Sequence, residues 1–154
     1  MNYTDTLMTD LTDDALQNAF RAYYEELGVN VTNWEGLFAE ISASPDCLFV
    51  RRDQHGNVIG FLLFAVMEAA TAGRGFFTSR LGCVEEFWVA PVCRKQGHGT
   101  ALLQLAEEHF ARLDCAYAIL TTDTVPLFYM KRGYRHQRGI TAKNRADVYV
   151  KSLT

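Results

Sequence analysis

The spacing of apolar residues predicts two amphipathic helices at the start of the chain. Over residues 11–27 apolar side chains recur every three or four positions, and Gly28 follows as a helix-terminating glycine. Over residues 34–41 four apolar side chains again fall on one helical face. Each segment is therefore predicted to bury one face and expose the other.

Three extended segments follow. Residues 47–52 and 58–67 are apolar runs separated by the turn-like sequence QHGN, which predicts a hairpin with Gly56 and Asn57 tolerating positive φ. Residues 81–90 (LGCVEEFWVA) are rich in β-branched and aromatic side chains and end before Pro91, which has no amide proton for a ladder.

The second half of the chain alternates between helices and strands. An apolar stripe predicts a helix over residues 99–113, and residues 116–122 form a short apolar strand of the kind buried on both faces. The sequences YRHQRG and ADVYVKSL predict a closing pair of strands.

A short helix is predicted between these strands, in the sequence DTVPLFYMKRG. Asp123 or Thr124 would be its N-cap, Pro126 would lie in its first turn, and Gly133 would terminate it. With it, the element order predicts an α/β fold with a mixed central sheet flanked by helices, in which the two strands joined by a helix are parallel.

Length and composition favour one domain over residues 1–154. The chain has 154 residues, of which 49% are hydrophobic and 21% charged, as in soluble globular domains. Its longest apolar run is about half of the ~20 residues that a membrane span needs, and the N-terminal residues do not resemble a signal peptide. We therefore expect a cytoplasmic protein with no membrane partner.

Charge and cysteine spacing narrow the choice of ligands. The net charge of −3 argues against a nucleic-acid partner and permits a cationic one. The four cysteines show no zinc-binding spacing, so we expect reduced thiols and no metal site.

The sequence PVCRKQGHGT, residues 91–100, joins the third strand to the next helix. The first amides of a helix lack internal partners and attract anions, glycines allow close approach, and Arg94 and Lys95 add positive charge. Neither the GxxxxGK[ST] nor the GxGxxG nucleotide-binding pattern fits. The alternative is a strand-to-helix turn whose glycines serve packing alone.

Two blocks resemble the Gcn5-related N-acetyltransferase (GNAT) family. The stretch EEFWVAPVCRKQGHGTALL is similar to its acyl-CoA signature, a strand ending in Val-x-Pro followed by Arg/Gln-x-x-Gly-x-Gly/Ala. PLFYMKRGY is similar to its second block, an aromatic-Tyr pair followed by Gly-aromatic. The matching residues are Val89, Pro91, Arg94, Gly97, Gly99, Phe128, Tyr129, Gly133 and Tyr134.

The resemblance implies a GNAT-like fold with a splayed cleft for acetyl-CoA as co-substrate. The pyrophosphate would rest on the loop amides and the pantetheine arm would pair with the third strand. Thr122 and Asp123 stand where many members carry a coenzyme-contacting Asn. The implied coenzyme-binding residues are Phe87, Trp88, Val89, Arg94, Lys95, Gln96, Gly97, His98, Gly99, Thr100, Thr122 and Asp123.

Acetyl transfer to an amine also needs a base and an acid. Glu85, Glu86 or an ordered water could deprotonate the amine; strand alternation points the two carboxylates to opposite faces unless a bulge intervenes, and Glu85 is slightly favoured. Both could instead be edge charges or partners of Arg80 or Arg94. Tyr129 resembles the family's general acid; the alternative is a packing role.

The resulting hypothesis is an acetyl-CoA-dependent N-acetyltransferase in which a primary amine, from a small molecule or a peptide, attacks directly in a ternary complex. A non-catalytic acyl-CoA-binding or sensor module and a ligand-free interaction domain are the alternatives. Exposed edge strands would permit a homodimer. The expected acceptor pocket is lined by residues of the first two helices and by residues 73–77: Tyr23, Tyr24, Asn33, Trp34 and Glu35.

Overall fold

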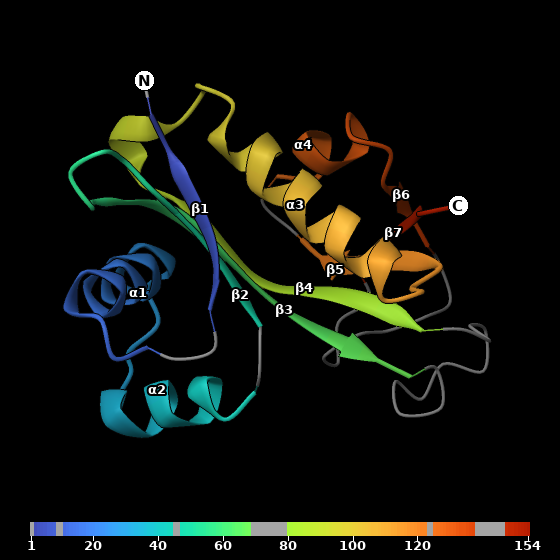
Figure 1. The fold of residues 1–154 in the computed structure, drawn as a ribbon. Coiled ribbons are helices and arrows are strands. Elements are labelled where there is room, and N and C mark those ends of the chain that lie inside the picture. The colour runs from blue at the N-terminus through green and yellow to red at the C-terminus, as the bar shows by residue number, and fades with distance from the viewer. Residues whose placement is uncertain (1, 9–10, 45–46, 69–79, 123–124, 138–146) are drawn as a thin grey trace. The chain divides into compact units, whose positions relative to one another are not determined.

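A computed structural model describes residues 2–8, 11–44, 47–68, 80–122, 125–137 and 147–154. Its elements follow the predicted alternation of helices and strands (Figure 1). In chain order they are β1 (Thr4–Met8), α1 (Asp14–Leu27), α2 (Trp34–Ser42), β2 (Leu48–Arg52), β3 (Val58–Met67), β4 (Leu81–Val89), the 3-10 turn η1 (Pro91–Cys93), α3 (His98–Arg112), β5 (Tyr117–Thr121), α4 (Pro126–Met130), β6 (Arg135–His136) and β7 (Val148–Ser152).

The strands form a mixed seven-stranded sheet in the order β1-β2-β3-β4-β5-β7-β6. The β1–β2, β2–β3, β5–β7 and β6–β7 pairs are antiparallel, whereas β4 and β5 are parallel. This confirms the predicted α/β class, the hairpin, and the parallel pair joined by a helix.

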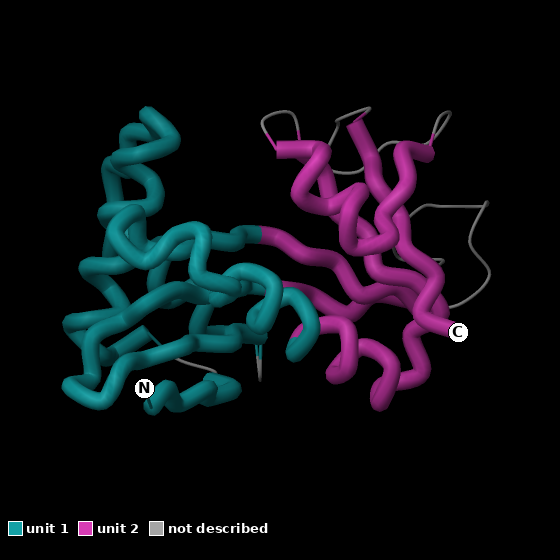
Figure 2. Tube along the Cα trace, turned by 90° about the horizontal axis from the view of Figure 1, so that it is seen from above, with its two compact units in different colours: residues 1–63, 86–105 teal, residues 64–85, 106–154 magenta. Residues whose placement is uncertain are grey.

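The chain divides into two compact units, coloured separately in Figure 2. Unit 1 comprises Met1–Leu63 and Glu86–Leu105, and unit 2 comprises Phe64–Glu85 and Ala106–Thr154. The elements β3, β4 and α3 each contribute residues to both units. A single domain over residues 1–154 stays a prediction.

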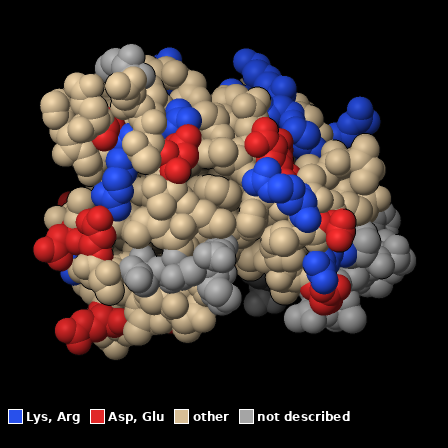
Figure 3. All heavy atoms as spheres, in the orientation of Figure 1, with Lys and Arg blue, Asp and Glu red and all other residues tan. Residues whose placement is uncertain are grey.

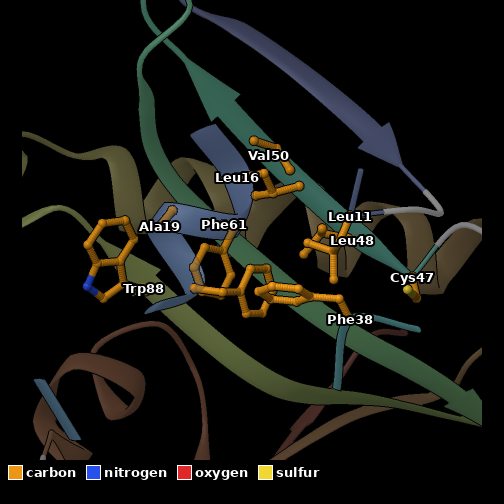
Figure 4. Close-up of a cluster of buried hydrophobic side chains, with 10 residues drawn as sticks. Leu11, Leu16, Ala19, Phe38, Cys47, Leu48, Val50, Phe61 and Trp88 are labelled. Atoms are coloured by element: carbon orange, nitrogen blue, oxygen red, sulfur yellow. The ribbon is translucent and has the colours of Figure 1, made fainter. Parts of the chain in front are cut away.

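Unit 1 has an apolar core between α1, α2 and the sheet (Figure 4). The rings of Phe20 and Phe61 stack with their centroids 4.0 Å apart. The core residues are Leu11, Leu16, Ala19, Phe20, Phe38, Cys47, Leu48, Val50, Phe61 and Trp88. They belong to the apolar stripes that predicted these helices and strands.

Local chemistry sets the ends of α1. The Asp13 side chain accepts hydrogen bonds from the amides of Ala15 and Leu16, and Gly28 ends the helix with φ of 74°. The helix therefore begins at Asp14, three residues later than the apolar spacing predicted, because Asp13 caps it.

Unit 2 has its own core of Leu81, Ile119 and Val148. Beside it, the buried Tyr134 donates a hydrogen bond to Glu107, which also binds the ammonium group of Lys151. This network joins α3 to β7 and satisfies the polar groups that the fold buries.

Strand β1 was not predicted. Its sequence TDTLM has no alternation of apolar and polar residues, and its first three residues are exposed. It forms because it pairs in register with β2, for example Asp5 with Arg51, and this partner is distant in sequence.

The predicted cap of α4 was wrong. The N-cap is Val125, no side chain caps the helix itself, and the Val125 amide donates to the hydroxyl of Thr122 at 3.3 Å. Asp123 and Thr124 lie outside the described residues. Pro126 does begin the helix, and Gly133 follows it with φ of 96°.

Figure 3 shows acidic and basic side chains interspersed over one face of the molecule. No helix among the described residues has the length and apolar character needed to cross a membrane.

Candidate functional site

The loop between β4 and α3 leaves a row of backbone donors open. The carbonyl of Gly97 accepts the first hydrogen bond of α3 from Ala101 at 3.0 Å, so the helix starts at His98. Within the described chain, the amides of residues 95–99 donate no hydrogen bond. The amide of Arg94, by contrast, donates a hydrogen bond to the carbonyl of Pro91 at 3.3 Å. Five successive N–H groups are therefore available at one helix end.

The backbone of this loop has an unusual shape. Lys95 has φ of 64° and Gly97 has φ of 89°, and Gln96 between them is not in the positive region. Alternation of this kind turns successive amides toward a common side and forms a concavity suited to anions. A Cβ at Gly97 would meet no atom within 4 Å, so space remains over the loop.

The cations of the loop differ in their partners. The Arg94 guanidinium contacts both carboxylate oxygens of Glu26 at 2.7 Å and donates through Nε to the carbonyl of Val89 at 2.9 Å. Lys95 makes no ion pair within the described residues. Arg94 thus ties the end of β4 to α1, and Lys95 is the cation that a ligand could meet.

The side chain of His98 does not face outward from the loop. It is only 4% exposed, and its Nδ1 lies 3.2 Å from Nη1 of Arg51 on β2. The ring of Tyr3 packs edge-on against it with a centroid distance of 4.7 Å. An anion at the loop would therefore meet the amide of His98 rather than its imidazole.

Glu86 on β4 has a defined partner in unit 1. The Tyr23 hydroxyl of α1 donates a hydrogen bond to it, and burial together with the charges of Glu86 and Glu40 raises the pKa of Tyr24 to about 12. Trp88, two residues further along β4, belongs to the unit 1 core beside α1. Because residues two apart on a strand point to the same face, this agrees with Glu86 facing α1 as well. Glu85 belongs to unit 2 and is half-buried.

The residues expected to line an acceptor pocket divide into two groups. The rings of Tyr23, Tyr24 and Trp34 form an aromatic row, with successive centroids 5.1 Å and 5.9 Å apart. Asn33 instead caps α2 by accepting the Gly36 amide at 3.0 Å, and Glu35 is exposed in the first turn of that helix. Residues 73–77 lie outside the described residues.

The pairing of β4 with β5 is short. Only Leu81–Cys83, the first three of nine residues in β4, are in register with Tyr117–Ile119. The coenzyme-binding residues predicted on β4, Phe87 to Val89, lie beyond the end of this register.

Tyr129 of α4 is buried within unit 2. It is 8% exposed, its ring packs against Phe128 and Tyr134, and burial raises its pKa to about 12. Thr122 was also predicted to contact the coenzyme, and its hydroxyl accepts a hydrogen bond from the Val125 amide. Asp123 lies outside the described residues. Among the described residues, no three potential metal ligands are clustered together.

Comparison with known proteins identifies the family. The family model described as "Acetyltransferase (GNAT) family" matches residues 7–134, well over half of the chain. The chain belongs to the GNAT acetyltransferase family. The match includes β4, the loop and α4, so both sequence blocks that suggested the resemblance lie inside it. A search of curated proteins gave no significant match.

Solved structures support the same fold for this GNAT chain. N-acetylglutamate synthase from Neisseria gonorrhoeae, complexed with coenzyme A and N-acetyl-glutamate, matches with a TM-score of 0.74 and 13% identity, over 100% of this chain but only 36% of that one. A GNAT acetyltransferase from Staphylococcus aureus Mu50 matches with a TM-score of 0.72 and 11% identity, covering 99% and 100% of the two chains. A chain of the NatC complex bound to Gag peptide and CoA matches with a TM-score of 0.72 and 14% identity, covering 100% of both chains.

Proposed function

We propose that this GNAT family member binds acetyl-CoA and transfers its acetyl group to a primary amine. The observation that carries the proposal is the row of five unpartnered amides over residues 95–99, at the start of α3. A diphosphate could accept several of these hydrogen bonds, and the helix dipole and Lys95 would favour its charge. Structures with the same fold have been solved with coenzyme A bound, which supports this ligand.

The pantetheine arm would follow β4 beyond the loop. We propose that the two amides of the arm pair with peptide groups of Trp88 and Val89, which lie beyond the register that β4 shares with β5, as an added strand would pair. The Val89 carbonyl already accepts a hydrogen bond from Arg94, so the pairing would involve the other peptide groups of these two residues.

We propose Glu86 as the base, acting directly or through a water. An alkylammonium ion has a pKa of about 10.4, so a base must deprotonate the acceptor before it can attack. The Tyr23 hydroxyl fixes the carboxylate of Glu86 in the same unit as the loop. Substitution E86Q should lower kcat by about 10²-fold, and the neighbouring E85Q serves as the matched comparison.

We propose Tyr129 as the acid that protonates the leaving group. The amine nitrogen attacks the thioester carbon, the C–S bond breaks, and the coenzyme leaves as a thiolate that takes the phenolic proton. A pKa of about 12 keeps Tyr129 protonated throughout the neutral range. The first proton of the ammonium ion passes to Glu86 before the attack, and the second leaves to solvent as the amide forms. When the products leave, Glu86 releases its proton to solvent and Tyr129 regains one from solvent, so that one proton is released overall.

The acceptor would be a small molecule or a peptide with a primary amine, bound beside the aromatic row of Tyr23, Tyr24 and Trp34. A panel of polyamines, aminoglycosides, amino acids and peptides, assayed for release of free thiol from acetyl-CoA, tests the proposal. At least one class should give amine-dependent release. Coenzyme binding without release for every class would indicate the non-catalytic module, and no binding at all would refute the proposed ligand.

A further inference from the structure

The first residue of α3 is anchored by a chain of polar contacts that reaches the edge strand. Arg51 of β2 binds Asp5 of β1 in a bidentate ion pair, with Nε–Oδ1 at 2.8 Å and Nη2–Oδ2 at 2.9 Å. Its remaining nitrogen, Nη1, lies 3.2 Å from Nδ1 of His98. Asp5 and Arg51 are also direct partners in the strand register, so backbone pairing fixes the two side chains opposite each other.

The contact with Arg51 defines the protonation state of His98. A guanidinium can only donate hydrogen bonds, so Nδ1 of His98 must present its lone pair. The imidazole is therefore neutral and carries its proton on Nε2. Its burial, at 4% exposed, and the edge-on ring of Tyr3 leave it little freedom to rotate away from Arg51.

We propose that His98 is a positioning residue for the coenzyme loop, whose neutral imidazole, held by Arg51, fixes the first turn of α3 and with it the open amides of residues 95–99. This inference rests on the proposed function. The His98 amide is itself one of the five donors, so rotation of the residue would move a donor directly. Diphosphate binding needs these amides at fixed positions, because misaligned donors lose most of their hydrogen-bond strength.

The anchor should fail in acid. Protonation removes the Nδ1 lone pair and places an imidazolium ion against Arg51, and the groups that face His98 are this guanidinium, the Asp5 carboxylate and the Tyr3 phenol. Burial first, and then Arg51, lower the pKa of His98 below its usual 6.5. The contribution of the neutral ring is therefore complete above about pH 6.5 and is lost as the pH falls through the folded-state pKa.

Three variants separate this role from simple packing. In H98N the amide oxygen can replace Nδ1 as acceptor but cannot be protonated, whereas H98L removes the acceptor. H55N removes a histidine from the exposed β2–β3 turn of the same unit and is the matched control. Coenzyme A affinity is measured calorimetrically at about pH 7.5 and about pH 5, with circular dichroism to verify folding.

Near pH 7.5, H98N should bind coenzyme A as tightly as wild type. When the pH falls to about 5, wild type and H55N should lose about tenfold more affinity for coenzyme A than H98N loses. H98L should bind about tenfold more weakly near pH 7.5 and raise KM for acetyl-CoA without changing kcat. Equal pH dependence of wild type and H98N would overturn the inference, even if H98L failed to fold. If wild type does not bind coenzyme A near pH 7.5, the proposed function itself fails, and the inference with it.

Discussion

At the scale of single residues, Gly97 gives the loop its shape through its backbone. Its φ of 89° strains any residue with a side chain, although nothing within 4 Å would touch an added methyl group. We expect Gly97→Ala to lower the free energy of unfolding by about 1 kcal/mol and to weaken coenzyme A binding at least tenfold. Gly28→Ala is the matched control, because Gly28 has φ of 74° and equally open surroundings at the end of α1.

Denaturant unfolding should show a similar loss of stability in both glycine variants, while calorimetry should show weakened binding only in Gly97→Ala. Equal coenzyme affinity in the two variants would mean that the loop backbone does not hold the ligand.

Tyr129 offers a second test at this scale. Tyr129→Phe keeps the ring that packs against Phe128 and Tyr134 but removes the proposed proton donor. We expect kcat to fall by about 10²-fold with little change in coenzyme affinity. Because the pKa of Tyr129 is about 12, its ionisation should give no basic limb in the wild-type rate profile below about pH 10. Unchanged kcat in the variant would assign the residue to packing.

The position of the loop between a strand and a helix could be predicted from sequence, but the directions of two of its side chains could not. Arg94 was expected beside an anion, and the structure pairs it with Glu26, a residue of α1 that lies 68 positions earlier. The family resemblance implies that His98 binds the coenzyme, but its ring packs against Tyr3 and Arg51. Local sequence contains no signal for such distant partners.

At the scale of elements, periodicity predicted the segments that bury one clear face. The helix α1 has apolar residues on a single stripe and ends at Gly28, so its pattern and its C-terminal signal agree. Strand β1 has neither property and depends on pairing with β2. Yet β1 supplies Asp5, through which it orients Arg51 and His98. The element that sequence could not predict is thus the one that anchors the loop.

At this scale, the close packing of β4 against α3 in unit 2 can be tested by mutation. A Cβ on Gly82 would overlap the ring of Phe110. We expect Gly82→Ala to destabilise the protein by about 1–3 kcal/mol and to lower Tm by about 2–4 °C for each kcal/mol. In a double-mutant cycle with Phe110→Leu, which shortens the opposing side chain, the two losses should be less than additive. Strictly additive losses in thermal unfolding would contradict the predicted overlap.

At the scale of the whole molecule, both compact units draw on discontinuous stretches of the chain. The loop amides, Lys95 and Glu86 belong to unit 1, and Tyr129 belongs to unit 2. Family membership follows from the match over residues 7–134 and is independent of how any of these side chains is oriented. The net charge of −3 remains compatible with a cationic acceptor.

The most direct test compares coenzyme A with pantetheine, which lacks the diphosphate and the adenosine 3′-phosphate joined to it, by isothermal titration of the wild-type protein. Two charge-assisted hydrogen bonds from the amides of residues 95–99 would contribute about 3 kcal/mol or more, so coenzyme A should bind at least about 100-fold more tightly. Equal affinity for the two ligands, or no binding of coenzyme A, would contradict a diphosphate site on these amides.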